Sequence, residues 1–521
     1  MRSIQPICTE LSRLSHPACR PQLRSHRTID VSIELKIDRS HSLAIYQQIV
    51  EQLKDRICNG RLPAGTRLPT VRRLAADLGV TRLTVQNAYS ALQEAGWVEA
   101  TVGRGTFVSQ AVRPTTFGRA LTPALSPDTV ISEILQVNHA VGLRSLASAS
   151  PDPHLFPAEE FWQGLITQQT DVAATGYGSS QGDPRLRVEI ARDLQERGID
   201  AAPDEIVVVA GVTQGLSLAA QCLAQAGDRV LVEQPTYLGL LHTIKAQGLQ
   251  PVAVPLDEHG PILDELERLL IQERPRFFYT IPTYQNPTGR CMALERRQAV
   301  LDLATAHGVV VVEDDIYARL AYDDPPPPPL KALDPTGSVV YVSSYSKLLM
   351  PGLRLGYLAA PPRLVERLIS LRRATDLCSP PLLQRALTIF LREGGLRRHL
   401  RRVLPLYRER RNALAQALAR HLPGAVQWST PQGGFCTWLT LPNYHAFADL
   451  ERAFLAQGWA VTPGEVFLAE AQTHKSLRIC FGSQPPETIA AGIQVLAGLI
   501  HDRLHGRSQP QPLVNDWAPL V

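Results

Sequence analysis

The chain has 521 residues, of which 44% are hydrophobic and 20% charged, and its formal net charge at pH 7 is +4. This length predicts two or more domains, the composition excludes a wholly disordered chain, and the small net charge argues against a protein that coats nucleic acid through bulk charge. No apolar run approaches the ~20 residues that a membrane-spanning helix needs, and the first residues lack the apolar stretch of a signal peptide. The eight cysteines show no C-x-x-C spacing and no zinc pattern, which favours reduced thiols and a cytoplasmic protein.

Changes of pattern along the chain predict five parts. Residues 1–35 are expected to be a disordered extension, and residues 36–109 alternate helical patterns with glycine and proline. Residues 110–145 include RPTTFGRALTPALSPD and are expected to be a linker. Residues 146–506 alternate short apolar runs with helical patterns, and residues 507–521 form a tail.

The first predicted helix lies near the start of the 36–109 region. Ile45, Ile49, Leu53 and Ile57 recur every four residues and predict an apolar stripe. Asn59–Gly60 is the expected end of this helix.

Two further helices and a hairpin are expected after it. Thr70–Leu78 predicts a short second helix, and Gly79–Val80 a tight turn. Thr81 is the expected N-cap of a third helix that runs to about Ala95. Two β-prone pieces around Gly103 then predict a two-stranded wing, so the region is expected to form a winged helix-turn-helix.

The string PAGTRLPTVRRLAADLGVTRLTVQNAYSALQEAGWVEATVGRGTFVS resembles the winged helix of the GntR family over its whole length. The resemblance implies that this domain binds double-stranded DNA through Arg72 on the second helix, Arg82, Thr84 and Gln86 at the start of the third, and Gly103 and Arg104 in the wing. Arg82 and Gln86 are the candidates for reading bases, since guanidinium suits guanine and a Gln amide suits adenine. Arg72 and Arg104 are the candidates for phosphate contacts. The alternative is a helix-turn-helix that contacts another protein.

Five short apolar runs mark the 146–506 region as an α/β domain with a mostly parallel sheet. They are EIVVVAG, DRVLVEQP, RFFYTIP, GVVVVEDD and SVVYVSS.

Lys347, in SSYSKLLMPGLRLGY, belongs to a series of motifs ordered as in fold type I pyridoxal-phosphate enzymes of the class I aminotransferase kind, which this region resembles. The resemblance implies pyridoxal phosphate as the cofactor, with Lys347 forming a Schiff base to it. In VVVVEDDIYARL, Asp314 would pair with the pyridine nitrogen and Tyr317 with the ring O3′, and in YQNPTG Asn286 would be a second partner of O3′. Tyr237 in EQPTY would stack on the ring.

The resemblance also implies how the phosphate and an amino-acid ligand are held. The phosphate would meet Val212 and Thr213 in GVTQG, together with Ser344 and Arg354. Tyr177, in TGYGSSQGDPRLR, would reach the phosphate of the neighbouring subunit. Arg478, in SLRICFG, would bind the carboxylate of a substrate or effector. Each motif is weak alone, but their agreement in one order favours the aminotransferase-like fold.

Both regions together resemble the MocR subfamily of GntR regulators, as do LKIDRSHSLAIYQQI and SPDPHLFP. The resemblance implies a head-to-tail homodimer that senses an amino compound, or pyridoxal phosphate itself, through exchange at the Lys347 aldimine. Asp314-x-x-Tyr317 has the spacing of working aminotransferases rather than that of many MocR regulators. A functional class I aminotransferase, acting on an aminoadipate- or kynurenine-like amino acid, is therefore the alternative. A third possibility is a domain that only dimerises.

Overall fold

The computed structural model describes residues 35, 37, 44–58, 62, 65–94, 97–101, 105–109, 144–166 and 176–506. Contacts divide the chain into two units, Met1–Thr122 and Pro123–Val521. The expected N-terminal extension up to residue 34, most of the expected linker (110–143) and the tail (507–521) lie outside the described residues. No helix in the described ranges is long and apolar enough to cross a membrane.

The described residues of the first unit form three helices and a hairpin. Helices α1 (Ile45–Cys58), α2 (Val71–Leu78) and α3 (Arg82–Glu94) precede the strands β1 (Val98–Thr101) and β2 (Gly105–Val108). The two strands pair antiparallel. The predicted winged helix-turn-helix is therefore confirmed.

Local signals in the sequence set the turn between α2 and α3. The Thr70 hydroxyl accepts a hydrogen bond from the Arg73 amide at 3.3 Å and caps α2. Gly79 ends α2 in the left-handed region, at φ 61° and ψ 36°, where a side chain would be strained. Thr81 caps α3 by accepting from the Thr84 amide at 3.2 Å. One apolar core holds the helices together, and it includes Ile49, Leu53, Ile57, Leu74 and Val85.

The second unit is built on an eight-stranded sheet of order β4-β11-β10-β9-β8-β5-β6-β7. Its central strands pair in parallel, whereas β11 and β7 pair antiparallel with their neighbours. The bounds are β4 Ile206–Val209, β5 Arg229–Gln234, β6 Gln250–Asp257, β7 Gly260–Pro261, β8 Phe277–Thr280, β9 Val310–Asp314, β10 Val339–Ser344 and β11 Gly356–Ala359. The five predicted apolar runs are β4, β5, β8, β9 and β10, and the predicted α/β class is confirmed.

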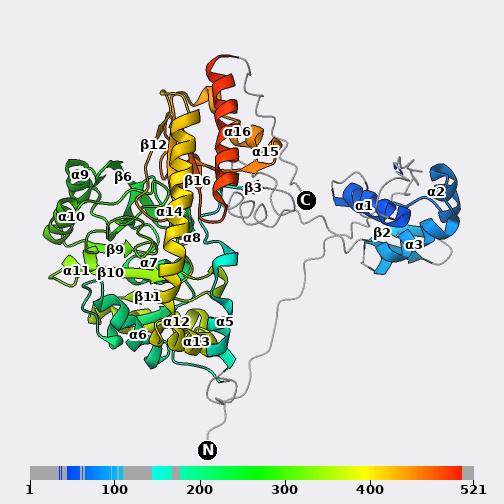
Figure 1. The fold of residues 1–521 in the computed structure, drawn as a ribbon. Helices are drawn as coiled ribbons and strands as arrows, with labels where there is room; N and C mark the ends of the chain where they lie inside the picture. The colour runs from blue at the N-terminus through cyan, green and yellow to red at the C-terminus, as the bar shows by residue number, and fades with distance from the viewer. Residues whose placement is uncertain are drawn as a thin grey trace, which may run out of the picture. The chain divides into compact units, whose positions relative to one another are not determined.

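Helices cover both faces of this sheet, as Figure 1 shows. One apolar cluster joins the sheet to α7, α8 and α12, and a larger one joins it to α6, α13 and α14. The helices are α5 Ala158–Ile166, α6 Pro184–Gln195, α7 Val212–Leu223, α8 Leu238–Ala246, α9 Leu263–Glu273, α10 Leu294–Ala306, α11 Leu330–Leu333, α12 Pro362–Asp376, α13 Pro381–Arg392 and α14 Gly395–His421.

A second, four-stranded antiparallel sheet has the order β12-β13-β16-β15. Its strands are β12 Gln427–Trp428, β13 Cys436–Leu441, β15 Thr462–Pro463 and β16 Lys475–Cys480, and α15 Leu450–Ala456 and α16 Pro486–Leu504 complete this part. Helix α16 packs along α14 (Figure 1). A separate pair joins β3 (Arg144–Ser145) in parallel to β14 (Trp459–Ala460), so the last two residues of the expected linker are a strand of this unit.

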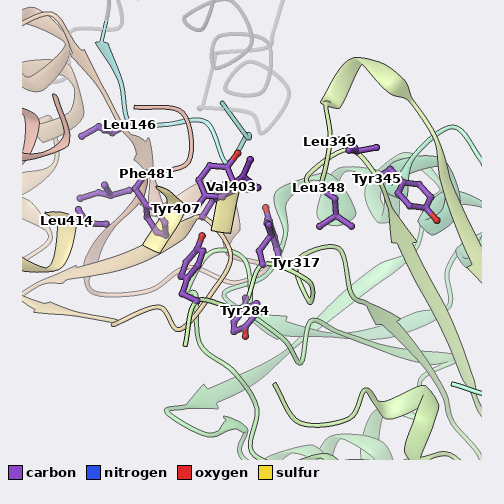
Figure 2. Packing of buried hydrophobic residues seen from close by; sticks show 14 of the residues in the cluster. Leu146, Tyr284, Tyr317, Tyr345, Leu348, Leu349, Val403, Tyr407, Leu414 and Phe481 are labelled. Carbon is purple, nitrogen blue, oxygen red and sulfur yellow. The ribbon is translucent and has the colours of Figure 1, made fainter. Parts of the chain in front are cut away.

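Aromatic side chains fill the junction between the two sheets. The Phe435 ring centroid lies 6.1 Å from that of Tyr317, 4.9 Å from that of Tyr407 and 6.4 Å from that of Phe481. Figure 2 shows those three partners, with Leu146 and Tyr284 in the same cluster. Tyr317 belongs to this junction and also lines the cavity at the end of the large sheet.

Candidate functional site

One cavity of about 220 Å³ opens where several strands of the large sheet end. Ten residues predicted for the cofactor site line it: Val212, Thr213, Tyr237, Asn286, Asp314, Tyr317, Ser344, Lys347, Arg354 and Arg478. The first and the last of them, Val212 and Arg478, lie far apart in the sequence. The fold therefore brings together in one cavity motifs that the sequence showed only as a series along the chain.

Tyr177 is the exception among the predicted cofactor residues. Its side chain is 87% exposed, and it is not among the residues that line the cavity of its own chain. A contact with the cofactor would therefore have to be made in another subunit.

One end of the cavity has the features of an anion site. Helix α7 begins at Val212, directly after Gly211 at φ 90°, and so presents free amide groups and the positive end of a helix dipole. The Arg354 guanidinium donates to the Ala210 carbonyl at 2.7 Å, and a Cβ on Gly211 would lie 3.0 Å from that guanidinium. The buried Ser346 hydroxyl has no hydrogen-bond partner among the described residues. These groups fit a phosphate.

Asp314 ends β9 and has one carboxylate oxygen available. Its Oδ2 accepts a hydrogen bond from the Tyr279 hydroxyl at 2.8 Å, whereas the buried Oδ1 has no partner within the described ranges. Burial raises the pKa of Asp314 to about 7, partly offset by the Tyr279 hydrogen bond, while neighbouring Asp315 raises it further. A protonated pyridine nitrogen fits Oδ1, because it would donate a hydrogen bond and bring a positive charge next to the buried carboxylate.

Lys347 follows β10 and is the only lysine among the residues that line the cavity. Burial, and then the positive charge of Arg478, lower the pKa of its ammonium group to about 8. A lysine with a lowered pKa is a better nucleophile near neutral pH, because more of it is the free amine. Lys347 therefore suits attachment to an aldehyde.

Arg478 lies on β16 and is buried without a carboxylate partner in the described parts of the chain. It donates to Asn286 Oδ1 at 3.0 Å, to the Ala147 carbonyl at 2.7 Å and to Thr462 Oγ1 at 3.2 Å. Its Nε has no partner among the residues described, and its guanidinium carbon lies 4.6 Å from the centre of the Phe467 ring. A buried cation without a counter-ion is costly, so the site is prepared for an anionic ligand group.

Sequence reasoning missed part of this site. Ser346 and Tyr279 were not predicted, and neither was the segment Ser148–Ser150, which lines the cavity. Ser346 directly precedes Lys347, and this position could have marked it as a site residue. Tyr279 and Ser148–Ser150 join the site only through tertiary contacts.

The predicted DNA-binding residues that are described lie on α2 and at the N-terminal end of α3. Arg72 on α2 is exposed, and so are Arg82 and Gln86 on α3. Arg82 and Gln86 are four residues apart and share a helix face. The Thr84 hydroxyl forms a hydrogen bond with the Thr81 hydroxyl, with an oxygen–oxygen distance of 2.8 Å.

Two further points concern the predicted DNA-binding surface. Leu83, which was not predicted, is 65% exposed at the start of α3, and apolar side chains at such positions can contact the thymine methyl group. Gly103 and Arg104 lie outside the described residues.

Comparison with known proteins identifies both parts of the chain. Residues 45–108 match the model of bacterial regulatory proteins of the gntR family, and residues 147–496 match that of aminotransferase class I and II. The uncharacterized HTH-type transcriptional regulator YdfD of Bacillus subtilis is 30% identical over 88% of this chain and 96% of its own length.

Two other relatives represent the regulator and the enzyme. The probable rhizopine catabolism regulatory protein MocR of Rhizobium meliloti is 32% identical over 76% of this chain and 81% of its own. The solved structure of LysN, an α-aminoadipate aminotransferase from Thermus thermophilus complexed with N-(5′-phosphopyridoxyl)-L-leucine, superposes with a TM-score of 0.67 at 33% identity, covering 74% of this chain and 96% of its own.

These matches agree with the geometry of the site, whose free Asp314 oxygen, anion pocket and cavity-lining lysine fit pyridoxal phosphate. The chain belongs to the MocR type of GntR-family regulators, in which a DNA-binding winged helix is joined to a class I aminotransferase domain that binds pyridoxal phosphate.

Proposed function

We propose that the protein regulates transcription in the cytoplasm as a head-to-tail homodimer whose DNA binding changes when a carboxylate-bearing amino compound enters the Lys347 cavity. The observation that carries this proposal is the convergence of Lys347, Asp314 and Arg478 on one cavity. The winged helix supplies the output, because its α3 presents Arg82 and Gln86 to solvent.

Each residue of the cavity would have a distinct task. When bound, pyridoxal phosphate supplies two things: an aldehyde, which reacts with amino groups, and an electron-withdrawing ring. Lys347 would hold that aldehyde and release it to an effector amine. Asp314 would keep the ring nitrogen protonated, the α7 N-terminus and Arg354 would hold the phosphate, and Arg478 would bind the effector carboxylate.

The roles of Tyr237, Asn286 and Tyr317 follow from their place in the cavity. Tyr237 is proposed to stack on the ring, and Tyr317 to donate to the ring oxygen. The Asn286 Oδ1 already accepts from Arg478, so its amide nitrogen is the group left to reach the ring. Asn286 would thus connect the cofactor with the carboxylate-binding arginine.

Two measurements on the purified full chain test the proposal. The visible absorbance of lysine-bound pyridoxal phosphate is expected in the native protein and in a Lys245→Ala control, whose lysine is exposed on α8, but not in Lys347→Ala. DNA selected by the protein from random oligonucleotides is then titrated with and without candidate amino acids. An absorbance that survives in Lys347→Ala, or a DNA affinity that no amine changes, would contradict the proposal.

A second function, transamination, is favoured by the intact set of Lys347, Asp314, Tyr317 and Arg478. With its pKa lowered to about 8, Lys347 can accept the Cα proton as a general base. With a 2-oxo acid added as the amino-group acceptor, multiple turnovers of keto acid from an aminoadipate- or kynurenine-like amino acid would establish this activity. A single turnover, with a change in DNA affinity, would support the sensor.

A further inference from the structure

The residues that directly follow the expected linker form a wall of the effector cavity. We name Arg144–Asp152 the entry segment, and three of its residues, Ser148, Ala149 and Ser150, line the cavity. Part of the cavity lining is therefore formed by the first residues of the second unit that the structure describes.

The beginning of the entry segment is fixed to the small sheet and its neighbours. Strand β3 pairs with β14, the Leu146 amide donates to the Ala460 carbonyl at 2.8 Å, and the Cys480 amide donates to the Leu146 carbonyl at 2.7 Å. Leu146 is fully buried, and the Arg144 guanidinium lies 4.1 Å from the centre of the Trp459 ring.

The end of the segment is fixed to helix α14. Asp152 Oδ2 accepts from Arg410 at 2.6 Å, and both side chains are 10% exposed. The Tyr407 hydroxyl lies 3.4 Å from the Asp152 amide nitrogen. The segment is therefore held at both ends. A local change in its middle is expected to act on these end contacts, because the segment is not a free loop.

The middle of the segment bonds to the carboxylate-binding arginine. The Ala147 carbonyl accepts from Arg478 Nη2 at 2.7 Å and from Thr462 Oγ1 at 3.0 Å. A carboxylate that binds a guanidinium side by side uses Nη1 with Nη2, or Nε with Nη2. Both arrangements involve Nη2, and the second also satisfies Nε, which has no partner within the described residues.

We propose that the entry segment responds to the effector carboxylate. A carboxylate that binds Arg478 accepts a hydrogen bond from Nη2 and weakens the bond from Nη2 to the Ala147 carbonyl. The backbone of the segment, which continues from the linker, then becomes less firmly held. This inference rests on the proposed function and adds the route by which the cavity acts on the linker. A ligand can shift the protein only through a difference in affinity between two states. Here that difference would arise because Nη2 already donates to the Ala147 carbonyl and to Thr462 Oγ1, so a carboxylate has to compete with both acceptors for its two N–H groups.

Two reagents that differ in one group test the inference. Aminooxyacetate and methoxyamine both carry an aminooxy group that reacts with the aldehyde of pyridoxal phosphate, but only aminooxyacetate carries a carboxylate. Hydrogen–deuterium exchange is measured on the full-length protein loaded with pyridoxal phosphate. Both reagents are expected to change the visible absorbance, whereas only aminooxyacetate is expected to speed exchange in residues 144–152 severalfold. Likewise, only aminooxyacetate is expected to change the affinity for selected DNA.

The outcomes separate the two proposals. If neither reagent changes the absorbance, the proposed cofactor site fails. If both change it and residues 144–152 exchange alike with either reagent, the site stands and the entry-segment inference is overturned.

A pair of variants tests the anchor on α14. Asp152→Asn removes the charge that holds Arg410, and exchange in the segment should already be fast without reagent, so that the difference between reagents disappears. Asp323→Asn is the control, because Asp323 pairs with Arg411 of the same helix at 2.8 Å but lies outside the segment. A wild-type response in Asp152→Asn, or an equal loss in Asp323→Asn, would contradict the inference.

Discussion

At the scale of single residues, three ionisable groups in the cavity favour a ligand that brings further charges and hydrogen bonds. Arg478 is a buried cation, Lys347 is a half-buried lysine of the same cavity, and Asp314 is a buried carboxylate with one free oxygen. Such an arrangement destabilises the empty protein and favours a ligand that supplies the missing charges and hydrogen bonds. The sequence predicted these residues because each stands in a recognisable motif.

The rate at which the apoprotein takes up pyridoxal phosphate should rise with pH, with a midpoint near the Lys347 pKa of about 8. Only the free amine attacks an aldehyde, and its fraction grows as pH passes through that pKa. In Arg478→Leu the midpoint should move upward, because a cation that disfavours the ammonium form is removed. Absorbance stopped-flow measurements across pH check this. A midpoint that stays in place would show that Arg478 does not act on Lys347.

Asp314→Asn should weaken cofactor binding on the order of ten- to a hundredfold, because hydrogen bonds to charged groups contribute about 1.5–3 kcal/mol. Titration of the apoprotein with pyridoxal phosphate measures the effect. Asp324→Asn, at an exposed position outside the cavity, should bind the cofactor as the native chain does. Equal affinities for Asp314→Asn and the native chain would remove Asp314 from its proposed role.

At the scale of elements, the strands that the sequence revealed are the continuous apolar ones. β4 and β10 are buried along their whole length, as strands covered on both faces should be. β6 was not predicted, because QPVAVPLD has two prolines and is mostly half-buried. β11 was missed because its sequence, GYLA, contains glycine and alanine, which are depleted in strands. The entry segment could not be predicted as part of the site, because its role depends on contacts with Arg478 and Arg410, 331 and 258 residues away.

Helix α3 should carry the base specificity of the regulator at its N-terminal end. Gln86→Ala is expected to lose about 1–3 kcal/mol of discrimination at one base pair while leaving non-specific binding unchanged. Ser90→Ala, also exposed on α3 but one turn further along, is the matched control. Binding to a set of singly substituted operators measures the discrimination. A uniform loss on all of them would instead assign Gln86 to the DNA backbone.

At the scale of the whole molecule, the proposed head-to-tail dimer would complete each cofactor site. In the proposed head-to-tail dimer, each cavity takes Lys347 from one chain and Tyr177 from the other, and the 87% exposure of Tyr177 in its own chain agrees with this. Tyr177→Ala alone should therefore weaken cofactor binding at both sites, and Lys347→Ala alone should abolish attachment at both.

A mixed dimer of these two variants separates a shared site from an unshared one. The cavity with an intact Lys347 then receives Tyr177 from the Lys347→Ala chain, so half of the sites should bind pyridoxal phosphate with native affinity. Cofactor titration of differently tagged, co-expressed chains measures this, with Tyr177→Ala homodimers and native/Lys347→Ala mixed dimers as references. If Tyr177 instead serves its own chain, every site that retains Lys347 keeps the Tyr177→Ala defect, and the mixed dimer binds as weakly as the Tyr177→Ala homodimer.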